Sequence, residues 1–264
     1  MFIVKIPLTN RQTKGCEKTP NEILKELKNI SSKEQGKPID LQSLNLEEIH
    51  VDNSDIEKSS ELIYKNAFEI FGEKPKTIFL GGDYSISYPI TRAFLDWCQN
   101  SGKEPCLIVF DAHADCINLI SRQTRDRWLK KLIEEGFPSE NILLVGVRNM
   151  QKDEIQFLKE KEIRIISINQ LLENLQDSCE IIMEFAHNKE LYVSIDIDVV
   201  DPAFAPAIDC PEPGGLSSRE FIYIIQRISK MKNLRVVDIV GINPDKDEKN
   251  STVKLGAKIL AELI

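Results

Sequence analysis

Short apolar segments alternate with longer amphipathic segments along almost the whole chain. Several of the short segments are apolar at consecutive positions, as in residues 107–110 (LIVF), which is typical of strands buried on both faces of a parallel sheet. Strands that alternate with helices form right-handed crossovers, and these place helices on both sides of the sheet. The pattern therefore predicts a three-layer α/β/α fold.

The individual elements follow from the same pattern. Strands are expected at residues 2–7, 47–52, 76–80, 105–110, 141–147, 162–167, 190–197 and 234–240. Helices are expected at residues 20–29, 55–72, 86–100, 124–136, 151–161, 177–188, 217–231 and 251–264. Residues 31–46 form the most loop-like stretch, but they are too short to mark a domain boundary. We therefore predict a single domain over residues 1–264.

Composition narrows the class of protein. The net charge of −8 argues against a nucleic-acid partner, because that role needs a basic surface. No apolar run approaches the ~20 residues of a membrane span, and residues 1–5 resemble a strand rather than a signal peptide. The six cysteines include no CxxC pair. We therefore expect a cytoplasmic protein with reduced thiols and no membrane partner.

Polar side chains gather where several predicted strands end, and in parallel α/β sheets the ligand site lies outside these carboxyl ends. The segments are GGDYS at residues 81–85, DAHAD at 111–115, SIDID at 194–198, and the region from Asp238 to Asn243. The sequence therefore predicts a site at one edge of the sheet.

Two of these segments carry the residues of a metal site. Asp111, His113 and Asp115 are spaced so that an extended chain places all three on one face, and Asp196 and Asp198 repeat the spacing. Crowded carboxylates require a cation or raised pKa values. Carboxylates with one imidazole suit Mn²⁺, Fe²⁺ or Zn²⁺, and the carboxylate majority favours Mn²⁺. The alternative is that each Asp only caps a turn, which explains two such clusters less well.

These motifs resemble those of the ureohydrolases, the family of arginases and agmatinases. The resemblance rests on DAHAD at 111–115, SIDIDVVDPAFAP at 194–206 and GGDYSISYPITRA at 81–93, the last being closest to the agmatinase version. Further matches lie at 15–20, 213–216 and 238–244. The resemblance implies a single α/β/α domain with a mostly parallel eight-stranded sheet, a small-molecule substrate, and a homo-oligomer, either a trimer or a hexamer.

Family members typically hold two Mn²⁺ ions bridged by a hydroxide that attacks a guanidinium carbon and releases urea. By resemblance, Asp111 and Asp196 would bridge the two ions, and His113 and Asp198 would complete one site. Asp115 would bind the other ion and, as the catalytic residue, pass on the proton of the hydroxide. The resemblance thus implies one or two Mn²⁺ ions per chain.

Several positions depart from the family pattern. Tyr84 stands where the family has a His, so we expect either a neutral phenol that hydrogen-bonds beside a single ion or a tyrosinate ligand. Gly241 stands where the family has a Glu that binds the guanidinium. Asp209 is a weak candidate to replace that Glu, and a turn residue is the even alternative. Residues 116–122 also lack the family's proton-shuttle His.

Two functional hypotheses follow. The first is a metal-dependent hydrolase that cleaves a C–N bond of a linear guanidino, amidino or related compound. The second is a degenerate homologue that keeps one structural ion and acts as a regulatory or partner-binding protein. The preserved Asp and His residues favour an enzyme, whereas the departures favour the second hypothesis or a changed substrate. Three arginines, Arg122, Arg125 and Arg127, are expected to begin a solvated helix rather than bind a substrate carboxylate.

Overall fold

A computed structural model describes residues 1–10, 12–116 and 128–264 of the chain. Its strands are Phe2–Ile6 (β1), Asn45–Glu48 (β2), Thr77–Gly81 (β3), Pro105–Phe110 (β4), Ile142–Val145 (β5), Arg164–Ile166 (β6), Glu190–Asp196 (β7) and Leu234–Val240 (β8). They form one eight-stranded sheet in the order β2-β1-β3-β8-β7-β4-β5-β6, with parallel pairing at each step. The predicted α/β fold with a mostly parallel sheet is confirmed.

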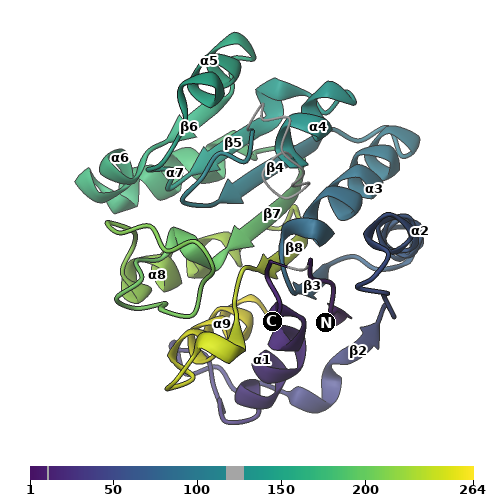
Figure 1. Cartoon of the computed structure of the whole chain (residues 1–264), viewed down its shortest axis with the longest axis vertical. Coiled ribbons are helices and arrows are strands. Elements are labelled where there is room, and N and C mark those ends of the chain that lie inside the picture. Colours follow the sequence, from purple (N-terminus) through teal and green to yellow (C-terminus); the bar gives the residue numbers. More distant parts are fainter. Residues whose placement is uncertain (11, 117–127) are drawn as a thin grey trace.

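Helices cover both faces of this sheet (Figure 1). Their bounds are Thr19–Leu27 (α1), Ile56–Glu73 (α2), Ser87–Asn100 (α3), Trp128–Glu134 (α4), Lys152–Glu160 (α5), Ile168–Glu173 (α6), Leu175–Phe185 (α7), Ser218–Ile228 (α8) and Ser251–Leu263 (α9). Buried side chains of α2, α3, α4 and α5 pack on one face, and those of α1, α6, α7, α8 and α9 pack on the other. None of the helices in the described ranges is both long and apolar enough to cross a membrane.

The central strands are buried on both faces, as their continuous apolar sequence predicts. In β4, Cys106, Ile108 and Phe110 belong to the core on one side of the sheet. Leu107 and Val109 belong to the core on the other side. Because successive side chains of a strand point to opposite faces, one apolar run supplies both cores.

Two elements of the structure differ from the prediction. The strand predicted at 47–52 lies at Asn45–Glu48, where it pairs with β1 alone at the edge of the sheet. The bounds of an edge strand depend on its backbone pairing rather than on its apolar residues. The apolar residue Ile49 is buried just after this strand. The helix α6 was not predicted, because its six residues are too few to show a helical period. A capping box of Ser167 and Gln170 begins it. The part of the predicted helix 124–136 before Trp128 lies outside the described residues.

The order of the strands brings distant parts of the chain together. After β3 the chain crosses to β4, and β7 and β8 later fill the place between these two strands. Figure 1 shows β3, β8, β7 and β4 side by side. The carboxyl ends of these strands therefore meet at one edge of the sheet, as doubly wound sheets require of a ligand site.

Candidate metal centre

A cavity of about 240 Å³ lies at the carboxyl ends of the central strands. Every residue predicted for the site is among those that line it: Tyr84, Asp111, His113, Asp115, Asp196, Asp198 and Asp209. The arginines at 122, 125 and 127 lie outside the described residues. The tertiary structure thus gathers the predicted side chains from the ends of β3, β4 and β7 and from the loop after β7.

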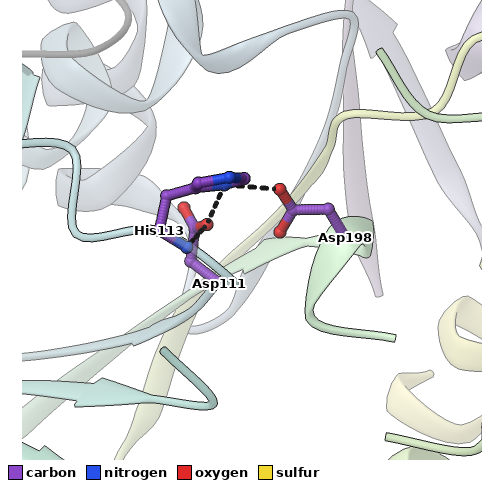
Figure 2. A group of neighbouring side chains, drawn as sticks. All are labelled: Asp111, His113 and Asp198. Carbon is purple, nitrogen blue, oxygen red and sulfur yellow. Dashed lines mark hydrogen bonds and ion pairs between the residues drawn. The ribbon is translucent and has the colours of Figure 1, made fainter. Parts of the chain in front are cut away.

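Asp111, His113 and Asp198 form the most compact group in this cavity (Figure 2). One potential ligand atom of each lies within 4.8 Å of the others. The His113 Nδ1 atom is 2.9 Å from Asp198 Oδ2 and 3.4 Å from Asp111 Oδ1. An imidazole and two carboxylates that converge in this way are a donor set for a divalent metal ion.

Backbone hydrogen bonds hold these carboxylates in place. Asp111 Oδ1 accepts from the backbone N–H of His113 at 2.6 Å, and Asp196 Oδ1 accepts from that of Asp198 at 2.7 Å. Asp198 Oδ1 accepts from the backbone N–H of Ala112 at 2.9 Å, which ties the end of β7 to the end of β4. Capping of turns by Asp and clustering of Asp therefore occur together, and the first orients the side chains for the second.

The crowded charges shift the pKa values of these groups. Burial and the charge of Asp198 raise the pKa of Asp111 to about 7, against the opposing effect of His113. Burial and the charges of Asp198 and Asp111 raise the pKa of Asp196 well above its usual range. Burial alone would lower the pKa of His113, but Asp111 and Asp198 outweigh it and raise that pKa to about 12. The cavity therefore favours positive charge at the position of the imidazole.

Asp115 lines the same cavity but does not belong to the compact group of three. Its backbone has a φ of 51°, a left-handed conformation that Asp tolerates better than most residues. Its Oδ2 atom accepts a hydrogen bond of 2.9 Å from Nε1 of Trp128. Trp128 is the first residue of α4 and is almost fully buried. Sequence analysis missed Trp128, because its distance along the chain from the DAHAD motif gave no signal of contact.

Tyr84 follows β3, in a 3-10 turn of residues 84–86 that is capped by Asp83. Its ring stacks on that of Trp128 with centroids 5.6 Å apart and planes inclined by 18°. The hydroxyl group is buried and has no hydrogen-bond partner in the described ranges. Burial raises the pKa of Tyr84 well above its usual value, and the charges of Asp111 and Asp196 add to this effect. Without a cation these effects favour the neutral phenol, the first of our two alternatives, whereas the tyrosinate requires a bound cation.

Asp209 already has a cationic partner within the chain. Its Oδ1 atom is 2.6 Å from Nζ of Lys246 and accepts from Nδ2 of Asn243 at 3.0 Å. The thiol of Cys16 donates to Oδ2 at 3.4 Å, and burial followed by the charge of Asp209 raises the pKa of that thiol. These contacts leave Asp209 at the cavity wall with its charge balanced by Lys246.

Gly241 lies against the carboxylate of Asp196. A Cβ atom added at this position would be 2.3 Å from Asp196 Oδ1, closer than side chains approach each other. The φ of 83° is a second obstacle to any other residue. The local geometry therefore excludes at position 241 the Glu that the family pattern has there.

Two further polar residues, Glu154 and Asp238, were not placed correctly by sequence analysis. Glu154 lines the cavity, and its carboxylate accepts from the backbone N–H groups of Cys116 and Gln151 at 3.0 and 2.9 Å. The capping box at the start of α5 was the signal that could have identified it. Asp238 is instead fully buried between β7 and β8, where Ser194 donates to it at 2.8 Å. The expectation that Asp238 belongs to the polar edge is wrong, because mid-strand residues do not reach it.

The fold is that of known arginase-like structures. The chain superposes on formimidoylglutamase from Bacillus subtilis with a TM-score of 0.90 at 24% identity, covering 99% of this chain and 84% of that one. With proclavaminate amidino hydrolase from Streptomyces clavuligerus the TM-score is 0.87 at 23% identity, over 99% and 89% of the two chains. The fold and the cavity thus define an α/β protein of the arginase type.

The sequence profile of the arginase family matches residues 1–264, and the chain belongs to this family. Arginase 1 of Arabidopsis thaliana is 28% identical over 250 residues, which are 88% of this chain and 69% of that protein. Agmatinase of Bacillus subtilis is 27% identical over 214 residues, which are 79% and 69% of the two chains. The family and these relatives are hydrolases that act on C–N bonds. The resemblance inferred from the motifs is confirmed.

Proposed function

We propose that this chain is a metal-dependent hydrolase that cleaves a C–N bond of a linear guanidino, amidino or related compound. The observation that carries the proposal is the convergence of Asp111, His113 and Asp198 within 4.8 Å in a cavity at the carboxyl edge of the sheet. Membership of the arginase family supports the same reaction class.

The donor set fits a divalent cation. Nδ1 of His113 faces Asp111 and Asp198, so a cation bound there would be held by all three groups and would balance the charge of the two carboxylates. We propose Mn²⁺, because oxygen ligands predominate over the single imidazole. Asp196, which lines the same cavity, is proposed as a further ligand, and Asp115 would be a ligand only of a second cation. A cation bound here would supply Lewis-acid polarisation and neutralise charge that develops in the transition state.

The residues of the chain have separate tasks in this reaction. Asp115 is proposed as the proton acceptor, because its carboxylate lines the cavity and Nε1 of Trp128 fixes its orientation through Oδ2. Such proton transfer contributes about 10²- to 10⁴-fold to a rate. The buried carboxylates of Asp111 and Asp196 favour a cationic group over a neutral one in the cavity. We thus propose that groups at the ends of β4 and β7, with Trp128 of α4, bind the cation and the substrate and accept the proton.

Two observations favour the second function, a degenerate homologue with a regulatory or partner-binding role. Gly241 has no side chain to grip a guanidinium, and the geometry around Asp196 admits none. Asp209, which could replace that carboxylate, is bound to Lys246. This part of the cavity therefore differs from the guanidinium-binding site of the family pattern. Only a measurement of activity distinguishes a changed substrate from a loss of catalysis.

The test is metal content combined with a substrate panel. We expect purified protein to contain manganese by mass spectrometry and to release urea or ammonia from at least one of a series of guanidino, amidino and formimino compounds. Asp198→Asn is the matched control, because it keeps the shape of the side chain but removes a charged ligand. Metal-bound protein without activity on the panel would favour the degenerate homologue, and protein that binds no metal would refute both proposals.

We also propose that the protein acts in the cytoplasm as a homo-oligomer. The support for the compartment is that the six cysteines of the sequence are scattered and include no CxxC pair, which is typical of proteins in a reducing environment. The support for the oligomer is the family to which the chain belongs. Light scattering of the purified chain measures the mass directly. A monomer at micromolar concentration would contradict the trimer or hexamer.

A further inference from the structure

The side chains that could bind a metal ion are unevenly distributed in the cavity. Asp111, His113 and Asp198 converge on one point, within 4.8 Å of one another. Asp115 lines the same cavity but stands outside this group. Its Oδ2 atom accepts from the indole of Trp128 at 2.9 Å. A cation bound to this oxygen would compete with the indole N–H of an almost fully buried Trp for the same carboxylate, which makes the oxygen a weaker ligand.

Tyr84 and Trp128 form a wall on this side of the cavity. Their rings stack with centroids 5.6 Å apart, and both side chains are buried, with Tyr84 7% exposed. Stacking fixes the phenol beside the acidic groups, where its hydroxyl group lacks a partner in the described part of the chain. A buried hydroxyl group without a partner indicates a ligand in the cavity that accepts or donates a hydrogen bond.

A neutral phenol is a much poorer metal ligand than an imidazole, which offers an unprotonated nitrogen. Besides the carboxylate of Asp196, the side of the cavity at Tyr84 and Asp115 therefore offers one weak donor and one carboxylate that already accepts from Trp128. The side at Asp111, His113 and Asp198 offers three good donors. The two sides differ in the number and the quality of their ligands.

We propose that the cavity holds a single divalent cation on Asp111, His113 and Asp198, and that the Tyr84–Trp128 pair closes the adjacent side to a second cation. The hydroxyl group of Tyr84 then hydrogen-bonds to a molecule bound beside the cation. This inference rests on the proposed function, since it specifies the metal content of the same site. It departs from the pair of Mn²⁺ ions that the family resemblance implies.

The experiment measures Mn²⁺ stoichiometry and the electron paramagnetic resonance spectrum of protein saturated with Mn²⁺ and then desalted. The unmodified chain should hold about one ion with the spectrum of an isolated Mn²⁺. Tyr84→His should raise the content toward two ions and give the spectrum of an exchange-coupled pair. The matched control is Tyr88→His, because the hydroxyl group of Tyr88 bonds to Glu135 away from the cavity. This control should stay at one ion.

A second variant tests the same wall from the other ring. Trp128→Phe keeps an aromatic ring for stacking but removes the N–H group that holds Asp115, so ion content under excess Mn²⁺ should rise above one. This variant decides the question if Tyr84→His does not fold.

The outcomes separate the two proposals. Two tightly bound ions in the unmodified chain would overturn the single-cation inference and leave the proposed function intact. An ion content that stays at one in Tyr84→His, or in Trp128→Phe where Tyr84→His does not fold, would overturn the role of the aromatic wall. No bound ion in the unmodified chain would overturn the metal site, and the proposed function with it.

Discussion

Gly241 sets the shape of the cavity wall at the scale of single residues. It has a φ of 83° and lies where any Cβ atom would meet both carboxylate oxygens of Asp196. Its backbone N–H also donates to the carbonyl of Gly82 at 3.1 Å, which links the ends of β8 and β3. The absence of a side chain at this position is therefore a requirement of the packing around Asp196.

The chain offers a matched pair of glycines to test this requirement. Gly36 has nearly the same φ, 81°, but a Cβ atom added there would have no neighbouring atom within 4 Å. Gly36→Ala should lower the free energy of unfolding only by the cost of the left-handed backbone, about 1–2 kcal/mol. Gly241→Ala should lower it by roughly 1–3 kcal/mol more, because the added methyl group overpacks the site. Thermal unfolding of both variants measures the difference, and equal losses would contradict a clash with Asp196.

Arginine and agmatine should be poor substrates, although the chain belongs to the arginase family. Gly241 supplies no carboxylate to a guanidinium, and Asp209 is held by Lys246. Loss of a charge-assisted contact costs about 2–4 kcal/mol, or roughly 10²-fold or more in rate. Urea release from each compound provides the measurement. Turnover of agmatine at about 10 s⁻¹, the rate of an ordinary enzyme, would show that another group binds the guanidinium.

At the scale of elements, a buried carboxylate joins the neighbouring strands β7 and β8. Asp238 on β8 accepts hydrogen bonds from the hydroxyl groups of Tyr192 and Ser194 and from the backbone N–H of Ile195, all on β7. Burial raises its pKa from 3.8 to about 6, although Tyr192 and Ser194 oppose the change. The strand that carries Asp196 is thus joined to its neighbour by side chains as well as by the backbone.

This raised pKa predicts how stability depends on pH. Between about pH 4 and 6 the folded chain holds the Asp238 proton more tightly than the unfolded chain does. The free energy of unfolding should therefore fall as the pH rises through this range, by roughly 3 kcal/mol at most, and then level off. Asp238→Asn should remove this contribution. Denaturant unfolding at several pH values measures the difference between the two proteins, and a difference that does not vary between pH 4 and 6 would contradict the assignment.

The candidate metal centre depends on the fold of the whole molecule. Asp111 and His113 follow β4, whereas Asp198 follows β7, more than eighty residues later in the sequence. These groups meet only because β7 pairs with β4 in the sheet. We propose that residues 1–264 fold as one domain, so that assembly of the centre and folding of the chain are a single event.

Binding of Mn²⁺ should therefore stabilise the folded chain by mass action. A free ion concentration of 100 times the Kd corresponds to about 2.7 kcal/mol. The melting temperature of metal-free protein should rise with added Mn²⁺ and fall again with a chelator, in one cooperative transition. Asp198→Asn should lose most of this rise. An unchanged melting temperature in protein that is verified to be metal-free would contradict the site.

The sequence alone determined the fold class and named most of the acidic residues that line the cavity. Consecutive apolar residues in β4 required burial on both faces, and the polar segments after β3, β4 and β7 identified the edge of the sheet. These features are local, because strand burial and residue spacing are visible in a few neighbouring positions. Short α6 escaped prediction and the edge strand β2 was predicted with shifted bounds, since neither carries a strong period of its own.

Only the tertiary structure decided which of these residues act together. Trp128 holds Asp115 and stacks on Tyr84, and Lys246 balances Asp209. No spacing in the sequence predicts such contacts, because they join residues of different turns, loops and helices. The sequence thus named the acidic residues, whereas their pairing, and with it the proposed number of cations, depends on packing between elements.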